Sequence, residues 1–297
     1  MSLSFATLNH FLLSAAHLFG AIAGWLWWLV DVKSKRIAQQ NIAQSGLFNN
    51  LDPLIDSKPS TLNGFEMPKK PKNAVRTNFV ETGKGLFETL YLWLNPSENL
   101  SNLVRQVHGW QHIEAALHAQ KGLIFLTPHM GCFEITSIYY GSKNPITVLY
   151  RPPKLKWLTR LMNAGRARKG VALAEANASG VRKLMQALKR GEAIGILPDQ
   201  IPKAGDGEWA DFFRLPAYTM TLACKLAEKT GATVIMAFGE RLPNGAGFTI
   251  HLTRVDSIAT PTLLNLAVEK QITQNPAQYL WSYDRWKQRR HALKTSS

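Results

Sequence analysis

The sequence predicts an α/β fold in which a mainly parallel or mixed sheet is flanked by helices, with one apolar helix preceding it near the N-terminus. Two observations predict this fold. From about residue 73 onward, short apolar runs alternate with amphipathic stretches, as is typical of buried parallel strands joined by helices. Residues 11–30, FLLSAAHLFGAIAGWLWWLV, carry no formal charge over about the length of a membrane-spanning helix.

The apolar N-terminal segment has the flanks of a membrane anchor. Trp25, Trp27 and Trp28 lie near its end, where their rings favour the headgroup layer. Lys33, Lys35 and Arg36 follow directly, and such positive residues mark the cytoplasmic side. We therefore expect a membrane helix over residues 1–31, with the bulk of the chain in the cytoplasm.

Two other interpretations of this segment stay open. Ala21-Ile22-Ala23 resembles a signal-peptide cleavage site, but residues 1–9 contain no basic side chain and the apolar run continues past the site. A buried helix of a soluble protein is the second alternative, because Ser14 and His17 make the stretch less apolar.

The next segment reads as a basic amphipathic helix followed by a linker. Residues 33–46 have helical spacing and end at Gly46, and we expect this helix to lie along the bilayer surface. Residues 49–73 contain four prolines and four lysines, which is typical of a loop. The sequence thus divides into a membrane anchor (1–31), a basic amphipathic and linker segment (32–72) and a folded domain (73–297).

Within the folded domain, apolar spacing predicts the order of the elements. A helix is expected over residues 76–94, which Asn95-Pro96 ends. Buried strands are expected at residues 122–127, 145–150, 193–197 and 232–238, with a further strand at one edge over 248–255. Helices are expected at residues 113–119, 133–140, 155–166, 179–189 and 219–228.

Composition restricts the function. The formal net charge of +15 and the pI near 9.9 indicate an anionic partner, which could be nucleic acid, anionic lipid or an acidic protein. The two cysteines exclude a disulfide framework and a cysteine-rich zinc site. The sequence contains no Gly-x-Ser-x-Gly elbow, no phosphate-binding Gly-x-x-x-x-Gly-Lys loop and no His-Glu-x-x-His array. We accordingly expect no metal.

The sharpest chemical candidate is the segment TPHMGCFE at residues 127–134, directly after a predicted strand. A neutral imidazole at His129 could take the proton of an attacking hydroxyl, while the Glu134 carboxylate fixes its tautomer. In a regular helix a five-residue offset would turn the two side chains about 140° apart. Gly131 must therefore permit an irregular turn for the two to pair. A structural, hydrogen-bonded histidine is the alternative.

Further stretches follow in a fixed order. They are Tyr150-Arg151-Pro152, GRARKG at residues 165–170, LPDQ at 197–200, Phe212-Phe213 and WSYDRWK at 281–287. Together with the His-x4-Glu segment and the N-terminal helix, they resemble the lipid A biosynthesis late acyltransferase family, a lysophospholipid acyltransferase-like group with a His-x4-Asp/Glu motif.

This resemblance implies a glycerolipid acyltransferase-like fold and a set of site residues. His129 and Glu134 would form the acid/base unit. Substrate would be bound by Arg151, Arg166, Arg168, Asp199 and Gln200. The oxyanion would be stabilised by backbone N–H groups near Gly131 or by Arg166. A solvated basic face is the structural alternative for the charges at residues 151–169, and a turn cap is the alternative for Asp199.

The resemblance also implies the partners, and it implies that the enzyme binds no cofactor. The acyl donor would be an acyl carrier protein, the acceptor a phosphorylated lipid A precursor, and the location the cytoplasmic face of a bacterial inner membrane, within lipopolysaccharide biosynthesis. Acyl-coenzyme A is the alternative donor and another membrane lipid the alternative acceptor. A catalytically silent, basic membrane-binding protein of the same fold is the alternative without chemistry.

Three residue-level features complete the expectations. The acidic segment at residues 203–211 departs from the family pattern and could alter acceptor choice. Cys132 invites a covalent Cys-His interpretation, although a free cysteine is more often a small buried hydrophobe. We expect no binding to nucleic acid, because the basic residues lack a recognised nucleic-acid module beside them.

Overall fold

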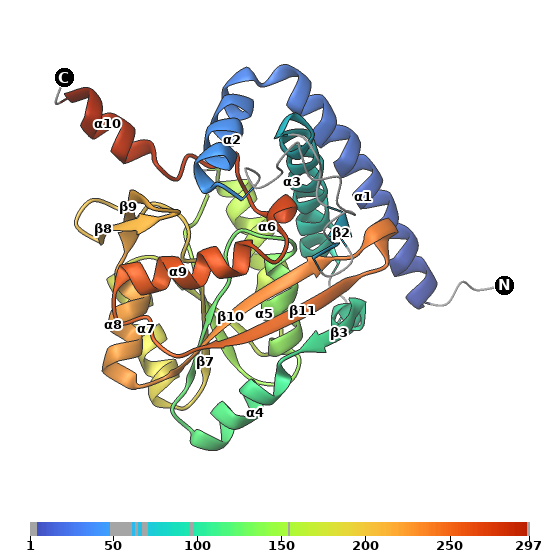
Figure 1. The fold of residues 1–297 in the computed structure, drawn as a ribbon. Helices are drawn as coiled ribbons and strands as arrows, with labels where there is room; N and C mark the ends of the chain where they lie inside the picture. Colours follow the sequence, from blue (N-terminus) through green and yellow to red (C-terminus); the bar gives the residue numbers. More distant parts are fainter. Residues whose placement is uncertain are drawn as a thin grey trace.

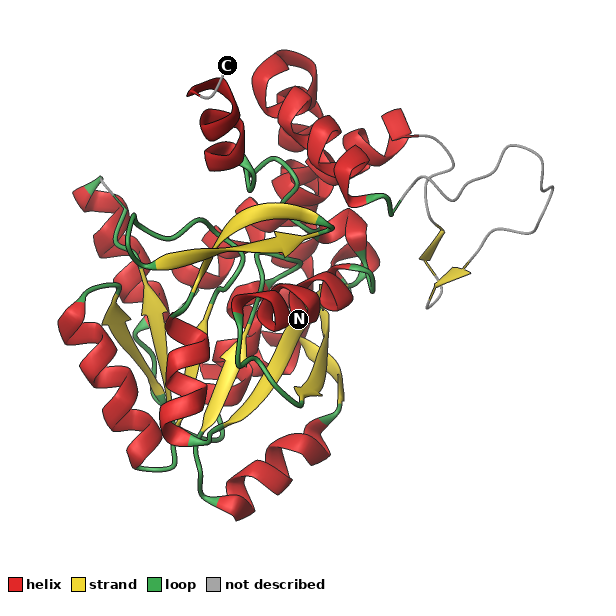
Figure 2. Cartoon of the chain, turned by 60° about the vertical axis from the view of Figure 1, so that its left-hand side comes forward, coloured by secondary structure: helices red, strands yellow, loops and turns green. Residues whose placement is uncertain are grey.

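A computed structural model describes residues 5–47, 61–62, 65–66, 71–95, 98–153 and 155–295. A seven-stranded sheet runs through the molecule, and helices cover both of its faces (Figure 1; Figure 2). The α/β fold expected from the alternating pattern is therefore confirmed.

The sheet is mixed but mainly parallel. Its order is β3 (Val104–His108), β11 (Phe248–Val255), β10 (Thr233–Arg241), β4 (Leu123–Leu126), β7 (Ala193–Ile196), β5 (Ile146–Tyr150) and β6 (Val171–Glu175). Only the β10–β11 pair is antiparallel. All four residues of β4 and of β7 are buried, as expected for continuous apolar runs in the centre of a parallel sheet.

The predicted edge position of residues 248–255 is wrong. These residues form a strand, but β3 pairs with it on its outer side and becomes the edge, while β6 forms the opposite edge. Both edge strands are only partly buried. Because their sequences, VRQVH and VALAE, are short and half polar or small, they do not carry the continuous apolar signal of a central strand.

Two apolar cores fill the space between sheet and helices. Helices α4 (Trp110–Ala119) and α5 (Phe133–Gly141) contribute to one core, and α7 (Ala178–Lys189), α8 (Leu222–Thr230) and α9 (Pro261–Ile272) contribute to the other. Alternate residues of β4 point to the two cores, with Phe125 in one and Leu126 in the other. The chain also forms α6 (Lys156–Arg166), α10 (Lys287–Thr295) and the 3₁₀ turns η1 (Glu98–Leu103), η2 (Pro243–Gly245) and η3 (Pro276–Gln278).

A two-stranded hairpin stands apart from the main sheet. Strands β8 (Gly207–Phe212) and β9 (Leu215–Met220) pair antiparallel and lie beside α9 (Figure 1). Part of the acidic segment at residues 203–211 thus belongs to a strand rather than to a loop. Phe212 and Trp286 are both fully buried, with their ring centroids 5.4 Å apart, so the C-terminal WSYDRW segment packs under this hairpin.

Three helices form the N-terminal side of the molecule: α1 (Phe5–Val30), α2 (Val32–Ser45) and α3 (Pro71–Leu94). Helix α1 runs along α3 (Figure 1). Among the described residues, α1 is the one helix long and apolar enough to cross a membrane by length and composition. Helix α3 begins five residues before the predicted start at Arg76. Apart from the small β1–β2 pair (Thr61–Leu62 and Phe65–Glu66) and the start of α3, the predicted linker at 49–73 lies outside the described residues.

Helix α2 matches its prediction in extent and in its cap. Gly46 follows its last residue with φ +69°, the left-handed conformation that glycine adopts at helix ends. Its Asn41 amide donates to the carbonyl oxygens of Trp281 and Tyr283, both at 2.8 Å. The division into segments 1–31, 32–72 and 73–297 remains a prediction, and α2 packs directly on the C-terminal part of the domain.

Candidate active site

A cavity of about 990 Å³ opens beyond the carboxyl ends of β4, β5 and β7. Ligands of α/β proteins bind at this edge of a parallel sheet. His129, Arg151 and Gln200, which follow the three strands, all line the cavity. Its wall also contains apolar side chains, namely Phe133, Leu149, Met162, Val181, Leu197, Met220 and Leu222. An elongated apolar group and a charged group could therefore bind side by side.

The turn after β4 has the irregular shape that the sequence required. Gly131 has φ +56°, and a Cβ atom built on it would lie 2.2 Å from the Gly239 carbonyl oxygen. The Gly131 N–H donates to the Gln278 carbonyl oxygen at 3.0 Å, and the Cys132 N–H donates to Gly239 at 2.8 Å. The turn is thus fixed between the end of β10 and the C-terminal segment, and only glycine fits at position 131.

The imidazole of His129 pairs with Asp199. Its Nδ1 lies 2.9 Å from one carboxylate oxygen, and its backbone N–H donates to the other at 3.0 Å. Because the Asp199 carboxylate accepts a hydrogen bond from Nδ1, Nδ1 carries the proton and Nε2 keeps its lone pair. The Gln200 amide lies 3.2 Å from Nε2, at the cavity. His129 is therefore oriented with Nε2, the nitrogen that can act as a base, facing the cavity beside the Gln200 amide.

Asp199 is held as a carboxylate. Burial of the group would raise its pKa, but the charge of His129 in its protonated form and the hydrogen bonds from His129 outweigh burial, and the pKa lies below its ordinary value. The buried Tyr279 phenol lies nearby, and its pKa is raised by burial first and by the Asp199 charge second. An ionised Asp199 stabilises the imidazolium that forms when His129 takes a proton.

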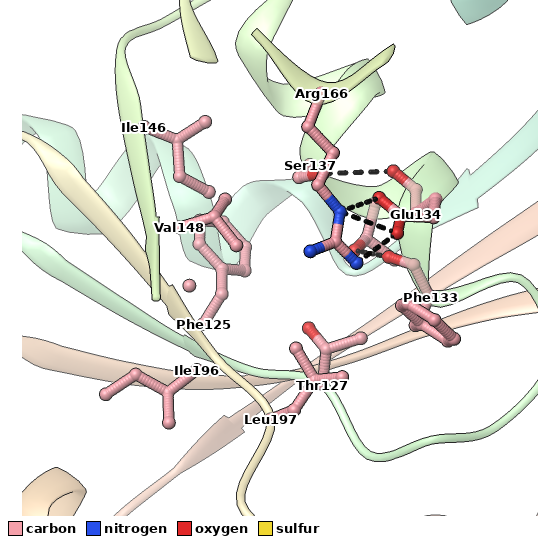
Figure 3. Close-up of a pocket in the computed structure, with 12 residues that line it drawn as sticks. Phe125, Thr127, Phe133, Glu134, Ser137, Ile146, Val148, Arg166, Ile196 and Leu197 are labelled. Carbon is pink, nitrogen blue, oxygen red and sulfur yellow. Dashed lines mark hydrogen bonds and ion pairs between the residues drawn. The ribbon is translucent and has the colours of Figure 1, made fainter. Parts of the chain in front are cut away.

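Glu134 pairs with Arg166 instead of with His129 (Figure 3). The Arg166 Nε donates to both carboxylate oxygens, at 2.8 and 3.1 Å, and Nη2 donates to one of them. Glu134 lies in the first turn of α5, where the helix dipole favours a negative charge. Both side chains line a small hollow of about 20 Å³ above Phe125, Ile146 and Val148. Since Arg166 also lines the large cavity, Glu134 fixes one guanidinium at its wall.

The structure thus changes the expected pairing while keeping the residues together. The sequence predicted that Glu134 would orient His129, but the carboxylate that does so is Asp199, which was predicted to bind substrate. Of the two candidate oxyanion donors, the Gly131 amide is engaged by Gln278, and Arg166 lies at the cavity.

Arg168 does not take the predicted position in the site. Its guanidinium donates to the carbonyl oxygens of Gly165 at 2.7 Å and Asn95 at 2.8 Å, and also to Leu92. It therefore ties the end of α6 to the end of α3. Burial lowers the pKa of Arg168 below its ordinary value, and the nearby Glu134 charge offsets only part of this shift.

Sequence reasoning missed three cations that line the cavity: Arg182, Lys203 and Lys225. Together with Arg151, these three residues line the cavity, whose wall also contains the acidic residue Asp206. Arg182 and Lys225 belong to α7 and α8, and only the strand order brings these helices to one edge. The sequence could have indicated Lys203, since it lies three residues after the LPDQ segment.

Cys132 is a buried hydrophobe and not a free nucleophile. It is 2% exposed, and burial raises the pKa of its thiol well above the ordinary value. Burial likewise raises the pKa of Cys224 to about 11. Among the described residues, no group of three or more histidine, cysteine, aspartate or glutamate side chains could hold a metal ion.

Comparison with known proteins agrees with the geometry. The profile of the family described as bacterial lipid A biosynthesis acyltransferase matches residues 64–288. A lipid A biosynthesis lauroyltransferase of Escherichia coli (strain K12) is 27% identical over 229 residues, which cover 73% of each chain. A lipid A biosynthesis palmitoleoyltransferase of the same organism is 26% identical over 222 residues, or 72% of each chain. The chain belongs to the bacterial lipid A biosynthesis acyltransferase family, and it is an acyltransferase.

Proposed function

We propose that this chain transfers a fatty acyl group from an acyl carrier protein to a hydroxyl of a phosphorylated lipid A precursor, at the cytoplasmic face of the inner membrane. One observation carries the proposal: a histidine oriented by a buried carboxylate faces a large, partly apolar cavity with several cations in its wall. The relatives named above are transferases of lauroyl and palmitoleoyl groups in lipid A biosynthesis, and this supports the same reaction class here.

The reaction begins with the acceptor hydroxyl against His129. Nε2 takes the hydroxyl proton as the oxygen attacks the thioester carbonyl carbon, and Asp199 stabilises the imidazolium. The tetrahedral oxyanion is stabilised by Arg166, which Glu134 holds at the cavity wall. When the C–S bond breaks, the imidazolium returns the proton to the leaving thiolate. The products are an ester and a free thiol, and no covalent enzyme intermediate forms.

The cavity wall supports both predicted partners. Arg151, Arg182 and Lys225 suit phosphate groups, which the acceptor glycolipid carries and which an acyl carrier protein also carries on its prosthetic arm. The apolar side chains suit the acyl chain. The net charge of +15 further favours an acidic carrier protein and an anionic membrane surface.

The proposal is tested with radiolabelled acyl donors in detergent micelles that contain a lipid A precursor. We expect transfer from acyl-acyl carrier protein, with a higher kcat/KM than from acyl-coenzyme A. Transfer only from acyl-coenzyme A, or only to another membrane lipid, would replace the proposed donor or acceptor. A folded chain that binds these lipids without any transfer would instead indicate the catalytically silent membrane-binding protein.

A further inference from the structure

Helix α1 has small residues and two buried polar side chains on the side that faces the protein, and it is apolar on the side that faces outward. The buried positions along it are Asn9, Leu13, His17, Gly20 and Gly24, which recur every three or four residues and form one stripe. Apart from His10, its exposed large side chains are apolar: Leu8, Phe11, Leu12, Leu18, Phe19, Ile22, Trp25, Leu26, Leu29 and Val30. A surface helix in water has the opposite arrangement.

The inner stripe fastens α1 to the domain along its whole length. Near the start, Asn9 accepts hydrogen bonds from Tyr91 and Asn95 at 2.9 and 3.1 Å. In the middle, His17 lies 3.0 Å from the buried Glu88 carboxylate. Near the end, the ring centroids of Trp27 and Phe79 lie 4.9 Å apart. Helix α1 therefore cannot leave the domain without breaking buried polar contacts.

A close contact between α1 and α3 lies halfway along the apolar segment. A Cβ atom on Gly20 would lie 2.6 Å from the Gly83 carbonyl oxygen and 2.7 Å from the Lys84 Cα, so the two helices touch through their backbones. Lys84 pairs there with Glu81 at 2.6 Å. If α1 stood upright across a bilayer, this ion pair and the Glu88–Arg241 pair beside it would lie at the depth of the hydrocarbon centre. Ionised side chains at that depth are costly.

The end of α1 has the side chains of a headgroup contact. Trp25 is exposed, and the Lys35 ammonium lies 5.4 Å from the centroid of the Trp28 ring. Lys33 and Arg36, on the adjoining turn of α2, are exposed. Aromatic rings and basic side chains at one level suit the interface of an anionic membrane.

We propose that α1 lies in the plane of the membrane, with its outward face immersed in one leaflet of an anionic bilayer and its inner face on α3. In this orientation the apolar residues are in hydrocarbon while the ion pairs of α3 stay on the protein side. Both ends of α1 then lie on the same side of the membrane. This placement follows from contacts of α1 alone and goes beyond the proposed reaction.

The experiment measures the depth of spin labels along one line of the helix. Phe11, Leu18, Ile22 and Leu29 lie at offsets of 7, 11 and 18 residues, which are close to whole numbers of helical turns. Each is changed singly to cysteine in the full chain, labelled with a nitroxide and reconstituted into phosphatidylethanolamine–phosphatidylglycerol vesicles. Cys132 and Cys224 are buried, so the unsubstituted chain is the labelling control. Glu114→Cys, at an exposed position on α4, is the aqueous reference.

We expect all four labels to show the same high accessibility to oxygen relative to a water-soluble nickel chelate, and hence one common depth. A gradient with Leu18 and Ile22 deepest and Phe11 and Leu29 shallow would show a spanning helix and overturn the proposal. Four labels reached by neither reagent would show a protein partner on this face, and four labels with the accessibility of Glu114→Cys would show no immersion. Either result would also overturn it. No acyl donor is needed, so failure here leaves the proposed reaction untouched.

Discussion

Two carboxylates of the site have different partners, and we therefore propose different roles for them. Asp199 contacts the imidazole of His129, whereas Glu134 contacts the guanidinium of Arg166. In the proposed mechanism the first pair controls a proton, because the hydrogen that Asp199 accepts from Nδ1 leaves Nε2 basic. The second pair controls a fixed positive charge, because the guanidinium is held by more than one hydrogen bond.

Arg166→Lys tests the second pair at the scale of one residue. We expect kcat to fall by about 10²-fold, in the range seen when one oxyanion donor is removed, because lysine keeps the charge but not the forked geometry. Steady-state kinetics in micelles measures the effect. Arg182→Lys is the matched control. Arg182 also lines the cavity but does not stabilise the oxyanion in our mechanism, so this change should mainly affect KM. Equal kcat values for wild type and Arg166→Lys would exclude a role in stabilising the oxyanion.

Gly131→Ala tests the turn. We expect loss of folded protein or of most activity, because the new Cβ would meet the Gly239 carbonyl oxygen. Gly231→Ala is the control, since Gly231 has a similar φ of +62° but nothing within 4 Å. It should lower the free energy of unfolding by only about 1–2 kcal/mol. Thermal unfolding and activity are measured for both variants. Equal effects would mean that the positive φ alone, and not the contact with Gly239, requires glycine at position 131.

The sequence predicted the members of the site better than their pairing. His129 and Glu134 are close in sequence, so one motif indicated both. Asp199 lies 70 residues beyond His129, and it reaches the imidazole because β7 pairs directly with β4. No local pattern determines that strand order. The same reason explains why Arg182 and Lys225 were missed and why Arg168, inside the indicated basic block, turned out to hold α3.

At the scale of elements, a buried charge network joins α1, α3 and β10. Arg241, at the end of β10, donates to Glu81 at 2.7 Å and to Glu88, which also contacts His17. The backbone N–H of Arg241 donates to the Gln278 side chain at 3.0 Å, and the Gln278 carbonyl accepts the Gly131 N–H. The N-terminal helix is therefore connected to the catalytic turn through a short chain of polar contacts.

Arg241→Ala should be strongly destabilising. Removing the guanidinium leaves Glu88, which is fully buried, without its cation, and one-sided loss of a buried pair typically costs about 3–5 kcal/mol. Arg190→Ala removes an ion pair with Glu192 whose arginine is 56% exposed, and such surface pairs contribute about 0–1 kcal/mol. Denaturant unfolding in detergent measures both. Similar values for the two variants would contradict the structural role of the network.

Element prediction succeeded where one local signal was strong. The central strands and the helices between them follow from apolar runs and helical spacing. The edge strands β3 and β6 and the β8–β9 hairpin escaped, because their residues are partly exposed and their pairing depends on distant neighbours. The polarity of α1 was also hidden, since its outward face becomes visible only when α3 is placed beside it.

At the scale of the whole molecule, buried carboxylates make stability depend on pH. The pKa values of Glu81, Glu88 and Asp199 are all lowered in the folded chain: burial opposes ionisation, but their cationic partners outweigh it. A lowered pKa means that the unfolded chain binds protons more readily. The stabilisation is therefore complete above the unfolded pKa values of about 4 and is lost as pH falls below them.

We expect the unfolding temperature in detergent to be flat with respect to these groups above about pH 5 and to fall steeply below about pH 4. Asp199→Asn should be less stable at neutral pH but should show a shallower acid slope, because one of the three groups no longer titrates. Scans at a series of pH values measure both slopes. An acid slope unchanged by the substitution would mean that Asp199 titrates alike in the folded and unfolded chains.

The central claim is that His129 is the base, that Asp199 orients it, and that Glu134 acts through Arg166. The most direct test is the pH dependence of kcat for acyl transfer from acyl-acyl carrier protein to a lipid A precursor, comparing wild type with Asp199→Asn, Glu134→Gln and the control Cys132→Ala. We predict that Asp199→Asn lowers kcat by about 10²-fold or more and displaces the pH profile. Glu134→Gln should lower kcat without displacing it, and Cys132→Ala should change little. A pH profile of kcat that is displaced by Glu134→Gln and unchanged by Asp199→Asn would contradict the account. It would mean that Glu134, and not Asp199, orients the His129 imidazole.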